Sequence, residues 1–221
     1  MASNLARSLY GRAVGTPALA AFRMLSRTLL VAAPDRPPPQ LLANTIVVCW
    51  HQDLYLYLLT HLEQPHWRRH IWFVHDDMLT QPMHHMLRAL GVQKLVMGSA
   101  GHAGAREAAA EVTAHLSRPS EAWRTLINPD GPLGPPHRIK KGVLWMSAQA
   151  QAPIVPIRFS CSSHVELPWP WWDAKRVPRP GATVTVEYGA PCQVPRDYVS
   201  TDFDKYAGPL TAFLNRDRVD R

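Results

Sequence analysis

Short apolar segments alternate regularly with segments of helical spacing, and this alternation restricts the chain to few folds. From residue 45 onward, the apolar segments predict strands at 45–50, 71–74, 92–97, 123–127, 154–159 and 183–188, and the segments between or after them predict helices at 53–62, 82–90, 104–116, 141–150 and 203–214. Strands joined through helices pair mainly in parallel, with helices packed on both faces of the sheet. The sequence therefore predicts an α/β fold with a mixed, mostly parallel sheet flanked by helices.

The N-terminal segment differs in composition from the rest of the chain. Residues 1–33 contain four arginines and no acidic side chain, and Gly15-Thr16-Pro17 interrupts an apolar pattern of roughly helical spacing. We expect a pair of short amphipathic helices with a bend at this point, suited to docking on an anionic membrane surface. Packing of the same helices on the domain's own core is the alternative. A Pro-rich linker over 34–44 would then lead into one domain over 45–221.

The overall charge narrows the partners without choosing among them. The chain has a formal net charge of +7, which favours nucleic acid, anionic lipid or an acidic protein partner. It carries no helix-turn-helix, zinc-finger, RNP or P-loop signature, so we expect no nucleic-acid partner. It also lacks the G-x-S-x-G turn of serine hydrolases. No apolar run reaches the roughly 18–20 residues that span a bilayer.

An aromatic segment stiffened by prolines lies near the end of the domain. Leu167-Pro168-Trp169-Pro170-Trp171-Trp172 is followed by Lys175, Arg176 and Arg179. Tryptophan beside cations is typical of a loop at a membrane surface. A buried aromatic cluster and a lining for the entry of an acyl chain are the alternatives.

Several polar residues directly follow predicted strands, where ligands bind in such sheets. His51 follows the first strand, Gly98-Ser99 the third, and Asp130-Gly131-Pro132 the fourth. Asp130 is either a site carboxylate or a simple turn former. Gly98 and Ser99 either hold an anion through backbone N–H groups or form a plain connection.

Cations lie close to these strand ends. Arg138, Lys140 and Lys141 follow the Asp130 loop, so this region suits an anionic substrate with a proton to remove. Arg106, in the third predicted helix, is either a ligand for that anion or a solvated helix residue. His75-Asp76-Asp77 and His84-His85 lack the spacing of a metal site, and we expect no metal. Asp76 or Asp77 is a secondary candidate for the pocket of the acceptor.

Taken in order, short motifs along the chain resemble the lysophospholipid acyltransferase superfamily, and within it a bacterial branch of domain-of-unknown-function proteins related to lipid A acyltransferases. The matching pieces are Trp50-His51, Phe73-Val74-His75-Asp76-Asp77, Leu90-Gly91, Gly98-Ser99, Gly104 with Arg106, Pro129 to Pro135, Lys141-Gly142-Val143, Ala152 to Pro156, Trp172-Asp173 and Tyr188-Gly189-Ala190-Pro191. The resemblance implies a glycerol-3-phosphate acyltransferase-like fold and O-acyltransferase activity.

The resemblance also implies roles for individual residues. His51 would be the general base that takes the proton of the acceptor hydroxyl while the hydroxyl attacks a thioester carbonyl. Asp130-Gly131 matches the family's acidic loop. The superfamily usually places an acid five residues after the histidine, but this chain has Leu56 there. The partner that orients the ring is therefore Asp53, Asp130 or a backbone carbonyl.

Together these observations predict a bacterial acyltransferase of phospholipid biosynthesis at the cytoplasmic face of the inner membrane, bound peripherally. It would move a fatty acyl chain from acyl-carrier protein or acyl-CoA to a lysophospholipid-like or glycolipid hydroxyl. Its partners would be anionic membrane lipids and the thioester donor, and we expect no bound cofactor. A non-catalytic lipid-binding protein on the same fold is the alternative, suggested by Leu56.

Overall fold

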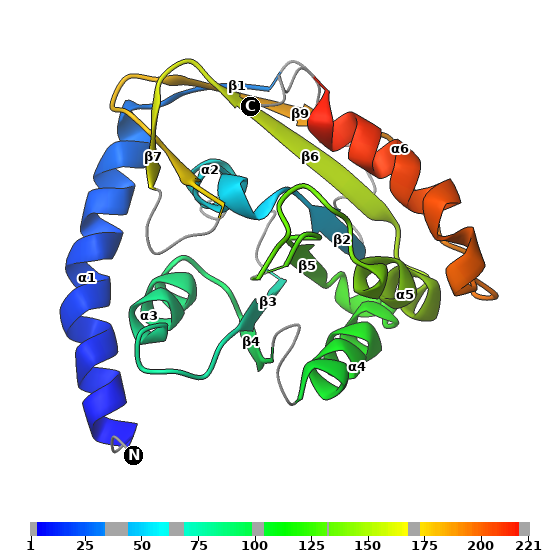
Figure 1. Ribbon diagram of the computed structural model, residues 1–221. Helices are drawn as coiled ribbons and strands as arrows, with labels where there is room; N and C mark the ends of the chain where they lie inside the picture. The colour runs from blue at the N-terminus through cyan, green and yellow to red at the C-terminus, as the bar shows by residue number, and fades with distance from the viewer. Residues whose placement is uncertain are drawn as a thin grey trace.

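The computed structural model describes residues 4–33, 44–61, 69–98, 104–131, 133–167 and 173–216 (Figure 1). The helices are α1 (Asn4–Thr28), α2 (Leu54–His61), α3 (Gln81–Ala89), α4 (Ala105–Leu116), α5 (Lys141–Ala150) and α6 (Phe203–Asn215). The strands are β1 (Leu30–Ala32), β2 (Thr45–Val48), β3 (His70–Val74), β4 (Lys94–Met97), β5 (Arg124–Ile127), β6 (Ile154–Cys161), β7 (His164–Leu167), β8 (Lys175–Pro178) and β9 (Thr183–Tyr188). Each predicted strand and helix from residue 45 onward corresponds to one of these elements.

Seven strands form the main sheet, in the order β1-β9-β6-β2-β5-β3-β4. Every neighbouring pair is parallel except β6 and β9, which run antiparallel. Val47 in the central strand β2 lies opposite Leu126 of β5 on one side and Val155 of β6 on the other. The predicted mixed, mostly parallel sheet is confirmed.

Two hydrophobic clusters cover the two faces of this sheet. Because side chains alternate along a strand, Val47 and Cys49 point into one cluster, and Ile46, Val48 and Trp50 into the other. The first cluster also takes side chains from α1, α2 and α3, and the second from α4, α5 and α6. Both faces of β2 are therefore buried, which explains why its sequence is continuously apolar.

The N-terminal segment forms one helix, so the expected pair of short helices is wrong. Pro17 lies inside α1 and lacks the N–H that would bond to the carbonyl of Ala13. Ala13 is exposed, so its carbonyl is open to solvent. Gly11 and Gly15 instead mark close helix packing, since a Cβ at Gly15 would lie 2.8 Å from the Pro82 carbonyl oxygen of α3.

The N-terminal segment also belongs to the folded domain instead of preceding it. α1 packs along α3, Leu19 and Leu29 enter the core, and β1 pairs in parallel with β9 (Figure 1). Packing on the domain's own core is thus the arrangement seen for residues 4–32. Of the expected linker over 34–44, residues 34–43 lie outside the described part of the chain.

A small antiparallel hairpin of β7 and β8 lies beside α2 and was not predicted. Of the aromatic segment before β8, residues 168–172 are outside the described ranges. Within those ranges, α1 and the other helices are too short or too polar to cross a bilayer.

Candidate active site

The candidate site lies at the carboxyl end of β2, in the middle of the sheet. β2 has β5 on one side and β6 on the other. After β2 the chain continues to β3 on the β5 side, and after β5 it crosses to β6 on the opposite side of β2. Such a reversal opens a crevice beyond the strand ends. His51 begins a short 3-10 helix, His51–Asp53, directly after β2, and its side chain is 15% exposed. The ring therefore lies at the crevice and remains accessible.

The carboxylate that orients His51 is Asp173. Oδ2 of Asp173 lies 2.9 Å from Nδ1 of His51, and the side chain of Asp173 is fully buried. When Nδ1–H donates to this carboxylate, the lone pair remains on Nε2, as a general base requires. Leu56, at the position of the usual acid, is buried in the core. The acid thus comes from a distant segment of the chain.

Lys175 completes the group around the ring. Its side chain is 2% exposed, and Nζ donates to the His51 carbonyl oxygen at 2.6 Å and to Asp173 Oδ2 at 2.9 Å. Nζ also lies 2.6 Å from His51 Nδ1. Lysine is almost never this buried unless its charge is paired. We conclude that Lys175 holds both Asp173 and the backbone of His51.

Burial and charge set the protonation of this group. Burial and the ammonium of Lys175 lower the pKa of His51 below its usual value, although the Asp173 hydrogen bond opposes them. Burial would raise the pKa of Asp173, but hydrogen bonds from His51 and Lys175 hold it below its usual value. At neutral pH the site therefore contains a neutral imidazole beside a carboxylate.

Asp130 acts on the backbone instead of the ring. Its carboxylate is fully buried and accepts the backbone N–H of His51 at 3.1 Å and that of His137 at 3.4 Å. Burial raises its pKa to about 6, against the opposing effect of these hydrogen bonds. Asp130 thus joins the turn after β2 to the loop after β5, and this contact fixes the position of the His51 backbone that carries the imidazole.

Asp53 lies in the same short helix as His51, but its carboxylate bonds in another direction. It is 2% exposed and pairs with Arg176, whose Nε donates to Oδ1 at 2.7 Å. Asp53 was one of the candidates for orienting His51, and the structure assigns that contact to Asp173. The expectation that Lys175 and Arg176 are surface cations near a membrane is also wrong, since both pair with buried carboxylates.

The loop between β5 and α5 carries cations and contacts the turn after β2 through His137. Gly131 adopts a positive φ of +70°, and Nζ of Lys140 lies 2.8 Å from where its Cβ would be, so Lys140 folds over the loop. Arg138 and Lys141 are exposed. His137 contacts Gln52, the neighbour of His51, through Nε2 and Oε1 at 3.0 Å. Pro132 is outside the described residues.

The remaining candidates lie farther along the sheet. Gly98 directly follows the edge strand β4, which lies three strands from β2, or on the order of 14 Å at the usual strand spacing. A Cβ there would lie 2.5 Å from Ala108 of α4, so close packing explains this glycine. Arg106 is exposed on α4. The structure does not bring these two residues to His51, and Ser99 is outside the described residues.

Three residues of the site were not identified as such from the sequence: Asp173, Lys175 and Gln52. Asp173 was noticed as part of a matching motif but given no role. A carboxylate and a lysine two residues apart, Asp173-Ala174-Lys175, are compatible with any exposed loop. Their burial depends on how the β7–β8 hairpin packs against the turn after β2, which local sequence does not reveal.

Comparison with known proteins supports the fold. No protein-family model and no curated protein sequence matches the chain. The crystal structure of the 1-acyl-sn-glycerophosphate (LPA) acyltransferase PlsC from Thermotoga maritima is similar, with a TM-score of 0.55 and 17% sequence identity, covering 96% of this chain and 81% of PlsC. The chain therefore shares the fold of this PlsC structure.

Proposed function

We propose that the protein is an O-acyltransferase in which His51 is the general base. The acceptor would be a lysophospholipid-like or glycolipid hydroxyl, and the donor an acyl-carrier protein or acyl-CoA thioester. The observation that carries the proposal is the contact between Asp173 and His51 at the carboxyl end of β2. The fold of the chain is similar to that of an enzyme named as an LPA acyltransferase, and this similarity supports the reaction class.

The reaction follows from the chemistry of these side chains. Nε2 of His51 takes the proton of the acceptor hydroxyl as its oxygen attacks the thioester carbonyl. Collapse of the tetrahedral intermediate breaks the C–S bond, and the departing thiolate takes that proton back from the imidazolium. Asp173 stabilises the imidazolium, while Lys175 keeps the resting ring neutral. No step needs a bound cofactor.

The cations of the loop after β5 suit the donor. Arg138 and Lys141 are exposed, and Arg138 directly follows His137, which contacts Gln52, the neighbour of His51. Coenzyme A and the arm of acyl-carrier protein both carry phosphate, which arginine and lysine bind well. A basic surface also favours an acidic carrier protein.

Peripheral docking on a bacterial inner membrane, from its cytoplasmic face, completes the proposal. The outward side of α1 leaves Leu5, Leu9 and Met24 exposed by 68%, 58% and 69%. Exposed apolar side chains on a helix without acidic residues are typical of an interfacial helix. The product would then enter phospholipid biosynthesis.

An acyl-transfer assay read by mass spectrometry tests the proposal. Purified protein would receive acyl-carrier-protein and acyl-CoA donors with a pool of lysolipids and glycolipids. We expect His51→Ala to lose the acylated product, and His164→Ala, which removes a histidine from β7, to keep it. The lipid-binding alternative was suggested by Leu56, which stands where the family usually has an acid. The contact of Asp173 with His51 supports the catalytic proposal instead. Lipid binding by a folded wild type without any transfer would favour the alternative.

A further inference from the structure

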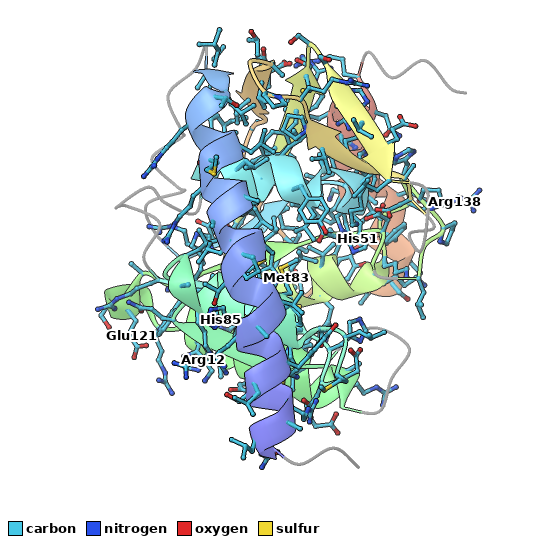
Figure 2. All side chains as sticks on the ribbon, turned by 90° about the vertical axis from the view of Figure 1, so that its left-hand side faces the viewer. Arg12, His51, Met83, His85, Glu121 and Arg138 are labelled. Atoms are coloured by element: carbon cyan, nitrogen blue, oxygen red, sulfur yellow. The ribbon has the colours of Figure 1, made fainter. Side chains whose placement is uncertain are left out.

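His137 lies in the loop between β5 and α5 and contacts the turn that carries His51. Its φ of +59° is left-handed, a conformation that costs conformational free energy for a residue with a Cβ. Figure 2 shows the next residue, Arg138, at the outer edge of the molecule and His51 further in. Arg138 is exposed, whereas His137 is half-buried. The left-handed backbone thus accompanies a side chain that turns inward, and the contacts made there must offset the strain.

One of these contacts joins His137 to the residue that follows His51. Nε2 of His137 lies 3.0 Å from Oε1 of Gln52, although 85 positions of the chain separate the two residues. An amide oxygen only accepts, so Nε2 of His137 carries the hydrogen and donates it. Gln52 is the second residue of the short helix His51–Asp53. Because this helix has only three residues, a contact to Gln52 restrains His51 as well.

A second contact joins His137 to the residue that precedes His51. The ring centroids of Trp50 and His137 lie 5.4 Å apart, and the two ring planes are inclined by 57°. Trp50 is 1% exposed, and its Nε1 donates to the Leu214 carbonyl oxygen at 3.2 Å and to Asn215 Oδ1 at 3.0 Å. The indole is therefore fixed against α6, and it gives the imidazole of His137 a rigid surface to pack on.

The backbone of His137 makes a third contact, through Asp130. The N–H of His137 donates to Oδ2 of Asp130 at 3.4 Å, and the N–H of His51 donates to Oδ1 of the same carboxylate at 3.1 Å. One buried carboxylate thus connects the backbones of the two histidines. Asp173 acts on the ring of His51, whereas these three contacts act on the backbone that carries the ring.

The position of that backbone matters because proton transfer depends on distance. A general base must lie within about 2.6–3.2 Å of the atom whose proton it takes. A displacement of about 1 Å at the reacting atoms can lower a rate roughly 100-fold. His137 is not suited to take the proton through Nε2, because that nitrogen already donates to Gln52. Its contacts suit a residue that holds another one in place.

We propose that His137 is a positioning residue for His51, which it holds by donating to Gln52, packing on Trp50 and sharing the carboxylate of Asp130. The role of His51 as the general base rests on the proposed acyl transfer. The restraint of the turn by His137 does not, and it can be measured without turnover.

A double-mutant cycle on the contact between His137 and Gln52 tests the proposal in the full chain. His137→Phe keeps a ring beside Trp50 and removes the donor, Gln52→Leu removes the acceptor, and a third protein carries both changes. Gln52→Leu leaves the left-handed residue in place, so the contact is tested even where phenylalanine at 137 fails to fold. His137→Gln restores an N–H donor of similar reach. His164→Phe, on β7, is the matched control.

Two readouts separate the restraint from the reaction. Initial rates with palmitoyl-CoA and oleoyl lysophosphatidic acid as the probe pair give kcat and KM. Hydrogen–deuterium exchange of a peptide that contains residues 50–53, read by mass spectrometry, reports the backbone N–H groups of the turn without any substrate. Thermal unfolding identifies the variants that are folded and can be compared.

We expect His137→Phe and Gln52→Leu each to lower kcat at least about tenfold and to leave KM within about twofold of wild type, because the base is misplaced. The double variant should lose no more kcat than either single variant, since both remove the same contact. His137→Gln should recover most of the loss. The turn should exchange its amide hydrogens severalfold faster in the three variants without the contact, but not in His164→Phe.

Wild-type kcat in a folded variant that lacks the contact, or additive losses in the double variant, would overturn the proposal. If the wild type transfers no acyl group between the probe pair, the exchange rates decide alone. Faster exchange of the turn would then support the positioning role of His137 while the proposed reaction loses support. Unchanged exchange would overturn the positioning role whether or not the protein transfers acyl groups.

Discussion

Asp173 Oδ2 lies 2.9 Å from His51 Nδ1, although 122 positions of the chain separate the two residues. The central strand supplies the histidine and the segment before β8 supplies the acid. An acid on the same helical turn would move with its histidine, whereas this one is held by an independent element. Four predictions follow from this arrangement and from the surfaces around it.

Removal of the Asp173 charge should slow the proposed transfer, and it should also reduce the free energy of unfolding, because the buried Lys175 ammonium loses a partner. In Asp173→Asn the amide no longer stabilises the imidazolium, and we expect kcat/KM to fall roughly 10²- to 10³-fold, within the range of general-base catalysis. Because Asp173 raises the pKa of His51, the acidic limb of the pH–rate profile should move to lower pH. A variant that keeps wild-type kcat/KM would remove Asp173 from the mechanism.

Replacement of Lys175 should shift the same profile in the opposite direction. The Lys175 ammonium lowers the pKa of His51, and activity needs the neutral ring, so activity is lost as pH falls through that pKa. In Lys175→Met the pKa rises and the acidic limb moves to higher pH. The buried Asp173 also loses a partner, which should reduce the free energy of unfolding by about 3–5 kcal/mol. Denaturant titration measures that loss, and an unmoved limb would contradict the electrostatic role.

The ion pair of Asp53 and Arg176 should matter for stability. Arg176→Ala removes the guanidinium that pairs with the nearly fully buried Asp53 carboxylate, and we expect a loss of about 3–5 kcal/mol of unfolding free energy. The double variant Asp53→Asn/Arg176→Met should recover part of that loss, since no buried charge remains. Folded Asp53→Asn should keep most of its kcat. A large drop in kcat without a stability change would instead support a catalytic Asp53.

The exposed side of α1 should determine binding to anionic vesicles. Leu5→Glu/Leu9→Glu places two charges where apolar side chains would enter the lipid boundary, and co-sedimentation should fall severalfold. Val199→Glu, at an apolar side chain 54% exposed before α6, is the matched control and should sediment like wild type. Because β1 and α1 belong to the folded domain, these point changes test docking more cleanly than a deletion of residues 1–33. Equal sedimentation of both variants would contradict membrane docking by α1.

Periodicity was sufficient to predict six of the seven strands of the main sheet. β2 and β9 are well-defined apolar or alternating segments between helices, and the structure places them as predicted. β1 and β7 have three and four residues, too few to show a period, and they depend on partners elsewhere in the chain. α1 was interpreted as two helices because proline usually ends a helix. Here the exposed turn before Pro17 tolerates the missing hydrogen bond.

The candidate site was predictable only where it depends on strand ends. His51 and Asp130 each follow a strand, and the structure brings them together through a backbone hydrogen bond. Asp173 and Lys175 follow no strand of the main sheet. Charged residues are usually exposed, so sequence reasoning placed Lys175 on the surface. Its burial becomes favourable through the partners that surround it in the folded chain, which composition and spacing do not encode.

The long separation between His51 and Asp173 also determines the order in which activity can arise during synthesis. The histidine leaves the ribosome early, but its carboxylate is made only when most of the sheet has been translated. A growing or truncated chain that ends before residue 173 contains the base without the residue that holds it. Such a fragment should lack the proposed transfer activity, which can arise only after Asp173 has been made and has packed beside His51.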